Sequence, residues 1–167
     1  MAWRWPDRQE IGQIRRLSMK EASRMVQGRS GPSDSPRPET GAPAGDVYDW
    51  FQRGMKLLTE GSPAAAVALL ERAADAEPES RSIREALARA QFNSRQYADA
   101  VHSFRWIVDA NPTEDYAYFG LGLALWRTGD MEGAQEPLAI AVAMRPDQRH
   151  YVSALKSVRA TLRARGM

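Results

Sequence analysis

Cysteine is absent from this sequence, and histidine occurs only twice. Without thiolates the chain forms neither disulfides nor cysteine-ligated zinc sites, and it has no cysteine nucleophile. His102 and His150 each stand alone, because no second ligand follows three or four residues later on the same helix face. The carboxylates are best read as solvated surface charge. We therefore expect no metal, no cofactor and no enzymatic activity.

Long apolar runs are absent as well. The longest uncharged apolar stretch, residues 117–126, is far shorter than a bilayer span. The first ten residues alternate charge with tryptophan and lack the continuous apolar segment of a secretory signal. These absences predict a cytoplasmic protein, and the alanine- and arginine-rich composition favours a bacterial one.

Charge is distributed unevenly along the chain. Residues 1–45 hold eight Lys or Arg against five Asp or Glu, residues 46–144 nine against fifteen, and residues 145–167 six against one. The body is therefore acidic and both ends are basic. Basic ends can bind nucleic acid or an anionic membrane, but they can also pair with acidic protein surfaces or stay solvated. The basic ends of this chain lack the interleaved aromatic residues on which bases would stack, which speaks against nucleic-acid binding.

The composition changes near residue 46. Residues 28–45 read GRSGPSDSPRPETGAPAG, which is too poor in large apolar side chains to offset the entropy of ordering, so we predict a flexible linker. Before it, Ile11, Ile14 and Leu17 recur at roughly helical spacing within a basic amphipathic segment, residues 1–27. The N-terminal part is thus predicted to be a partly disordered tail, followed by an alanine- and leucine-rich helical domain at 46–167.

A period of 34 residues organises the domain. Three series keep this spacing: Pro78, Pro112 and Pro146; Ala66, Ala100 and Ala134; Gly54, Ala88 and Gly122. The last series always carries a tiny side chain. Repetition at this period indicates stacked helical units, that is, a solenoid.

On these residues the chain resembles a tetratricopeptide repeat protein, a family with the pattern W-x2-L-G-x2-Y, A-x3-F and P. The matching units are residues 47–80, 81–114 and 115–148, with Arg84 and Gln91 departing from the aromatic positions of the second unit. Residues 149–165 read as a capping helix with a basic outer face. The resemblance implies an all-α fold: an α-solenoid of three helical hairpins, a C-terminal capping helix and the N-terminal tail.

The stretch FGLGLALWRTGD, residues 119–130, also suggests a phosphate-binding loop, but no strand precedes it. We instead predict that Gly122 lets the two helices of its hairpin approach closely. Gly120 costs roughly 1 kcal/mol relative to alanine, which suggests that something approaches the backbone there.

Local chemistry predicts the helix ends. Asp46 and Thr113 are predicted N-caps, Ser62 with Pro63 opens the second helix, and Gly129 ends the fifth. Pro137 falls inside the second helix of the third unit, where it kinks the helix or removes one hydrogen bond.

In this family the first helix of each hairpin lines the concave side. The resemblance implies a groove that is apolar and aromatic at both ends, with a charged centre. The alternative is that part of this set is core, covered by the next hairpin or by the closing helix. The predicted groove residues are Tyr48, Phe51, Met55, Leu58, Glu85, Arg89, Phe92, Tyr116, Phe119, Leu123 and Trp126.

The resulting prediction is a non-catalytic adaptor that binds an apolar helix or an extended peptide. The carboxylate clamp for chaperone tails is absent, since its positions hold Phe51, Met55, Ala86, Tyr116 and Gly120. One alternative is a small secretion-type chaperone for one client protein. The groove could also be filled by the chain's own N-terminal tail, either within one molecule or by exchange in a homodimer. An alternative from another class is a nucleic-acid accessory protein that uses its basic ends.

Overall fold

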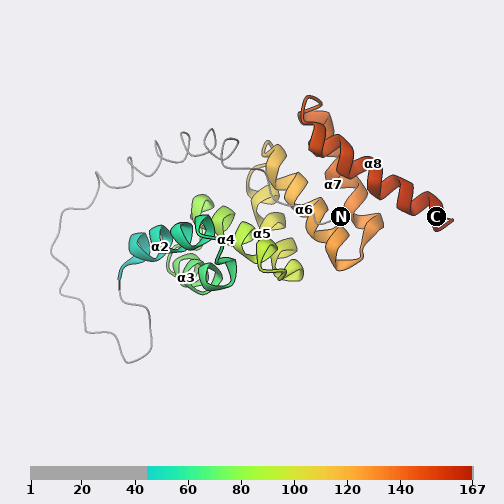
Figure 1. The fold of residues 1–167 in the computed structure, drawn as a ribbon. Helices are drawn as coiled ribbons and strands as arrows, with labels where there is room; N and C mark the ends of the chain where they lie inside the picture. The colour runs from blue at the N-terminus through green and yellow to red at the C-terminus, as the bar shows by residue number, and fades with distance from the viewer. Residues whose placement is uncertain (1–44, 167) are drawn as a thin grey trace. The chain divides into compact units, whose positions relative to one another are not determined.

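The structure is a computed structural model that describes residues 45–166, and this part of the chain is helical, without any strand. Its helices follow one another along the stack (Figure 1). They are α2 (Val47–Thr59), α3 (Pro63–Ala76), α4 (Arg81–Asn93), α5 (Tyr97–Ala110), α6 (Asp115–Thr128), α7 (Met131–Met144) and α8 (Arg149–Ala164). The all-α prediction is confirmed. The segment predicted at 1–27 and all but the last residue of the linker at 28–45 lie outside the described residues.

Each helix packs against the next one in the chain. The pairs α2 and α3, α4 and α5, and α6 and α7 are the three predicted hairpins, and α8 closes the stack. First helices also meet across hairpins, since α2 contacts α4 and α6 contacts α8. These contacts put the first helices on the inner side of the curve, where a repeat solenoid presents its concave surface.

The tiny side chains of the 34-residue series lie where the two helices of a hairpin meet. A Cβ added to Gly54 would stand 2.7 Å from Leu70 Cγ, and one added to Gly122 would stand 2.6 Å from Leu138 Cγ. Ala88, their counterpart in the second unit, is fully buried. Because the neighbouring side chain already fills that space, a larger residue would push the helices apart. The interpretation of Gly122 as a packing residue is confirmed.

Gly120 has a packing role of its own. The group that approaches its backbone is the Phe104 ring of α5, and an added Cβ would overlap the ring atoms Cε1 and Cζ. One repeat earlier, Ala86 takes the place of Gly120 and Leu70 the place of Phe104, and both are buried in one cluster. The smaller leucine leaves room for a methyl group. The glycine therefore compensates for the larger ring and is not a sign of a ligand.

Most predicted helix ends agree with the structure. The Asp46 side chain accepts a hydrogen bond from the Asp49 backbone N–H at 3.0 Å, and Gly129 ends α6 with φ = 94°. The predicted Thr113 cap is wrong, because α6 begins at Asp115 with Glu114 as its N-cap. The Thr113 hydroxyl instead donates a 2.7 Å hydrogen bond to Oδ1 of Asn111, the C-cap residue of α5.

Pro137 lies inside α7, as predicted, and the helix continues past it from Met131 to Met144. Its ring is buried at the repeat position that Ser103 holds in the second unit. There, Ser103 donates a 2.7 Å hydrogen bond to Gln91 Oε1, and both residues are buried. This pair explains why glutamine replaces the family's tyrosine in the second unit, since the buried amide and hydroxyl satisfy each other.

Arg84, the other departure in the second unit, forms half of a reversed pair. In the first hairpin the Arg72 guanidinium lies 4.4 Å from the centre of the Trp50 ring, with tryptophan on the first helix and arginine on the second. In the second hairpin the order is exchanged, because Arg84 lies on the first helix, 5.1 Å from the Trp106 ring on the second. Each of the two hairpins thus has a cation–π contact between its own two helices.

The first prediction concerns Gly120. We expect Gly120→Ala to lower the free energy of unfolding by about 1 kcal/mol, because overlap with Phe104 outweighs the gain in helix propensity. In a Phe104→Leu background the same change should raise stability, since leucine leaves the space that Ala86 uses. Urea unfolding of the four chains of this cycle measures the reversal of sign. Stabilisation by Gly120→Ala in both backgrounds would show that the ring does not restrict this site.

The second prediction concerns the reversed pair. Arg84→Trp and Trp106→Arg should each lower stability by about 0.5–1 kcal/mol, because the first places two aromatic rings together and the second two cations. The combined exchange copies the arrangement of the first hairpin and should recover most of the loss. Thermal unfolding of the single and double variants tests this, and two losses that simply add would disprove the pairing.

Candidate functional site

The exposed side of α2 is an apolar stripe at one end of the concave surface. Tyr48 is 53% exposed, while Phe51, Met55 and Leu58 are half-buried against the core of the first two hairpins. Their spacing of three or four residues places them along one face of the helix. Tyr48 is the one exposed large hydrophobic residue in the described part of the chain. A ligand that lies along α2 would therefore meet apolar atoms.

The adjacent α4 carries charge at the same level of the stack. Arg81, Glu85 and Arg89 recur every four residues and are half-buried. The Arg81 guanidinium forms an ion pair with Glu114, at 2.9 Å from its Oε1. This α4 stripe places charged side chains next to the apolar stripe of α2.

Tyr116, at the start of α6, lies beside these charged side chains. Its ring meets the edge of Phe104, with centroids 6.0 Å apart, and its hydroxyl is buried. Burial raises the pKa of the Tyr116 phenol well above its ordinary value, the carboxylate of Glu85 raises it further, and Arg89 opposes the shift. Because the phenol keeps its proton, it remains a hydrogen-bond donor beside Glu85 at any physiological pH.

Three of the predicted groove residues are in the core. Phe119 and Leu123 are each 1% exposed, and Phe92 is 6% exposed with its ring edge on Tyr97 at 5.3 Å. Phe119 is covered by α8, whose Tyr151 ring stacks on it at 4.4 Å. A ligand in the groove therefore cannot reach these side chains, while the predicted Trp126 is half-buried at the other end of α6.

The residues that cover Phe119 were not among the predicted site residues. The His150 ring stands edge-on to Phe119 at 5.2 Å, and the Tyr151 hydroxyl donates a 2.8 Å hydrogen bond to Asp115 Oδ2. This bond fixes the start of α8 to the start of α6. Continuing the 34-residue register past residue 148 would have placed His150 at the groove position of Tyr116, and Tyr151 at the buried position of Ala117.

The described residues contain neither a cluster of metal-ligating side chains nor a membrane-spanning helix. Between residues 45 and 166 no group of three or more His, Asp or Glu side chains could hold a metal ion. His102 is exposed on α5, and His150 packs on Phe119 and Tyr151. Over the same residues, no helix is both long and apolar enough to cross a bilayer.

Sequence comparison identifies the repeat. Two models described as tetratricopeptide repeat match residues 57–102 and 85–149, and together these segments cover more than half of the chain. No curated protein matches the chain.

Solved structures share the fold at low sequence identity. The first TPR of Spaghetti (RPAP3), bound to an HSP90 peptide, has a TM-score of 0.64 and 20% identity, over 70% of this chain and 92% of that one. MamA (MSR-1) has a TM-score of 0.67 and 22% identity, over 93% and 87%.

The C-terminal TPR-containing domain of a putative FK506-binding protein from Plasmodium falciparum has a TM-score of 0.66 and 18% identity, over 72% of this chain and 91% of that domain. At these identities the likeness concerns the fold alone. The matched repeat models agree with the register of small side chains and with the three helical hairpins and closing helix. The chain therefore belongs to the tetratricopeptide repeat family.

Proposed function

We propose that this protein is a non-catalytic adaptor that binds a polypeptide segment along the inner side of α2 and α4. The observation that carries the proposal is the accessible apolar stripe of α2, with Tyr48, Phe51 and Met55, beside the charged stripe of α4. Partly buried aromatic side chains next to polar groups supply both binding energy and orientation. Tetratricopeptide repeats are in general protein interaction modules, which supports the same reading.

The proposed ligand is an apolar helix or an extended segment with a few anchoring side chains. Its apolar residues would contact α2, and its polar groups would meet Glu85 and Arg89, which are half-buried. The other residues of the proposed groove are Leu58 and Trp126. Phe92, Phe119 and Leu123 support the groove from beneath.

An acidic chaperone tail is a poor match, although the Spaghetti (RPAP3) domain is bound to an HSP90 peptide. The positions that form a carboxylate clamp in such domains hold Phe51, Met55, Ala86, Tyr116 and Gly120 in this chain. None of these is a cation, and Ala86 and Gly120 are buried. We therefore expect selectivity for apolar segments, whether from a cytoplasmic partner, from a chaperone client or from residues 1–27 of the chain itself.

The third prediction tests the α2 stripe. Twelve-residue peptides selected from a displayed library on the full chain serve as probes, and their dissociation constants are measured by fluorescence anisotropy. Phe51→Ala combined with Met55→Ala should weaken binding by about 10- to 100-fold, because two central apolar anchors are removed. Circular dichroism should show unchanged helicity, since both side chains are half-buried.

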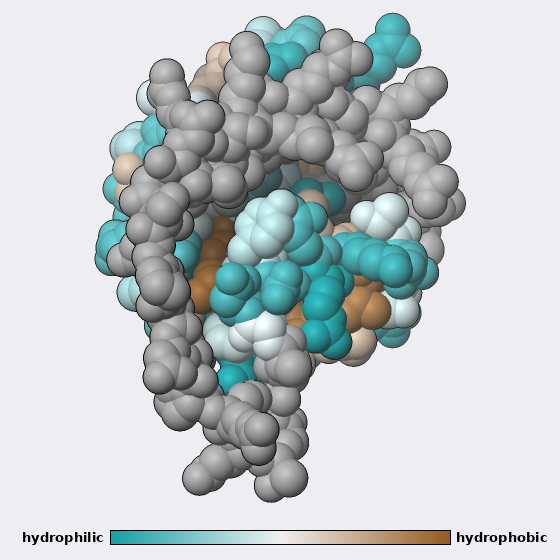
Figure 2. Space-filling model, turned by 90° about the vertical axis from the view of Figure 1, so that its left-hand side faces the viewer, coloured by the Kyte–Doolittle hydropathy of each residue, from teal (hydrophilic) through white to brown (hydrophobic). Residues whose placement is uncertain are grey.

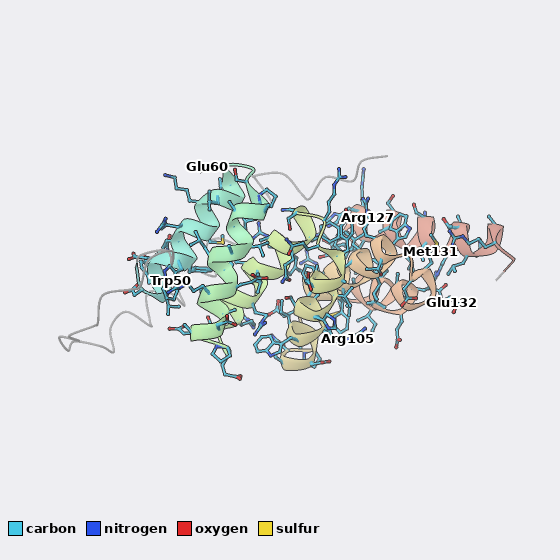
Figure 3. The ribbon with its side chains drawn as sticks, turned by 90° about the horizontal axis from the view of Figure 1, so that it is seen from below. Trp50, Glu60, Arg105, Arg127, Met131 and Glu132 are labelled. Atoms are coloured by element: carbon cyan, nitrogen blue, oxygen red, sulfur yellow. The ribbon has the colours of Figure 1, made fainter. Side chains whose placement is uncertain are left out.

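Met131→Ala provides the matched control. Met131 is also half-buried, but it lies at the start of α7, at the junction of α6 and α7 (Figure 3). Its truncation should leave peptide binding unchanged. Equal loss in the control, or full binding by the α2 variant, would reject the groove as the binding surface.

A further inference from the structure

The outer face of the last helix carries a concentration of positive charge. Between Arg149 and Gly166 the chain has no Asp or Glu. Its cations, all exposed, are Arg149, Lys156, Arg159, Arg163 and Arg165. Among residues 45–166, none of these cations forms an ion pair with an acidic side chain. By contrast Arg145, just before the helix, is paired with Asp147 at 3.1 Å.

Four of these cations, all except Arg165, lie along one side of α8. Arg149, Lys156 and Arg163 are seven residues apart, which is close to two helical turns, and together they extend over about 21 Å. Arg159 adds a cation one turn before Arg163. These four cations border two shallow depressions beside α8, and Glu132 is the one acidic residue that lines either of them. We call this surface the α8 basic face.

A complementary surface lies on the second helices of the first two hairpins. Glu71 and Asp75 on α3 and Asp99 on α5 are exposed, and Glu71 lies close enough to the other two carboxylates to feel their charge. Partial burial raises the pKa of the Glu71 carboxyl, and the negative charges of Asp99 and Asp75 raise it further. The closest basic residue along α3, Arg72, is held over the Trp50 ring. These three carboxylates form what we call the α3–α5 acidic patch.

The two surfaces of one molecule do not face each other. The basic helix α8 packs against α7 and contacts α6, whereas α3 packs between α2 and α4. Figure 1 shows α3 and α8 at opposite ends of the domain. Residues 1–45 carry three more basic than acidic residues, so they do not offer a complement to the α8 basic face.

We propose that the α8 basic face docks on the α3–α5 acidic patch of a second copy of this chain. Because the two surfaces differ, the contact is heterologous, and repeating it joins copies head to tail. An extended polyanion such as a nucleic acid fits less well, since residues 46–144 hold fifteen acidic against nine basic residues and would repel it.

Neither a bilayer nor stacked bases suit the α8 basic face. The residues between its cations are Val152, Ser153, Ser157, Ala160 and Ala164, which offer neither a large apolar anchor nor an aromatic ring. Figure 2 shows the α2 end of the domain, where hydrophilic residues lie beside small apolar areas. Charge is therefore the main source of complementarity between copies.

The fourth prediction is salt-sensitive self-association of the full chain. Sedimentation velocity at about 50 mM salt should show the weight-average mass rising with protein concentration beyond that of a dimer. At about 0.5 M salt, where screening shortens the range of the interaction to a few ångströms, the chain should be monomeric. A chain that is monomeric at every concentration, or association that persists at high salt, would overturn the proposal.

Charge reversal identifies the two surfaces. Variant one carries Arg159→Glu and Arg163→Glu, and variant two carries Glu71→Arg and Asp99→Arg. Each variant alone should remain monomeric. Their mixture should associate, because variant two keeps the α8 basic face and variant one keeps the acidic patch. Failure of the mixture to associate would contradict the assigned contact.

The matched control reverses two exposed cations elsewhere, with Lys56→Glu on α2 and Arg105→Glu on α5. It changes the net charge as much as variant one does and should still associate. Loss of association in the control would mean that net charge alone governs it. Tight binding of RNA or of anionic vesicles by variant two, but not by variant one, would assign the α8 basic face to those ligands instead.

Discussion

The distance at which neighbouring helices pack sets the geometry of everything else in this domain. Within a hairpin, Gly54 and Gly122 leave space that Leu70 and Leu138 fill. Between hairpins, the large ring of Phe104 requires a glycine where a leucine allows alanine. Because the interface is close-packed, one additional methyl group has no space to occupy and would shift the whole helix. The spacing of α2, α4 and α6, and hence the width of the surface between them, depends on these few small residues.

Much of this fold could be predicted from the sequence because its signals are periodic or local. A series repeated every 34 residues fixes the hairpins, and a cap such as Asp46 or a left-handed glycine such as Gly129 depends on its own turn. Interactions between helices were harder to predict. Arg84 appeared to break the pattern, because its compensating partner, Trp106, is twenty-two residues away on another helix. Thr113 was assigned to the wrong role because Asn111 competes for its hydroxyl.

The candidate groove was predicted less completely than the fold, and α8 is the reason. Repeat positions in α6 that would face an open concave surface are instead covered where the stack ends. Phe119 is buried because Tyr151 stacks on it, and Tyr151 is held there by its hydrogen bond to Asp115. Sequence periodicity assigns a residue to a face of its helix, but it does not say whether another helix covers that face. The accessible part of the groove therefore shifts towards α2 and α4.

The closing helix separates the two surfaces for which we propose recognition roles. Its inner side ends the groove with aromatic contacts, so the apolar surface left for a peptide is at the other end, on α2. Its outer side carries cations that the domain's own acidic residues do not neutralise. An apolar contact depends little on ionic strength, whereas a contact between exposed charges weakens steeply as salt rises. The proposed peptide binding on α2 and the proposed association through α8 can therefore respond to different conditions, although both depend on the same stack of helices.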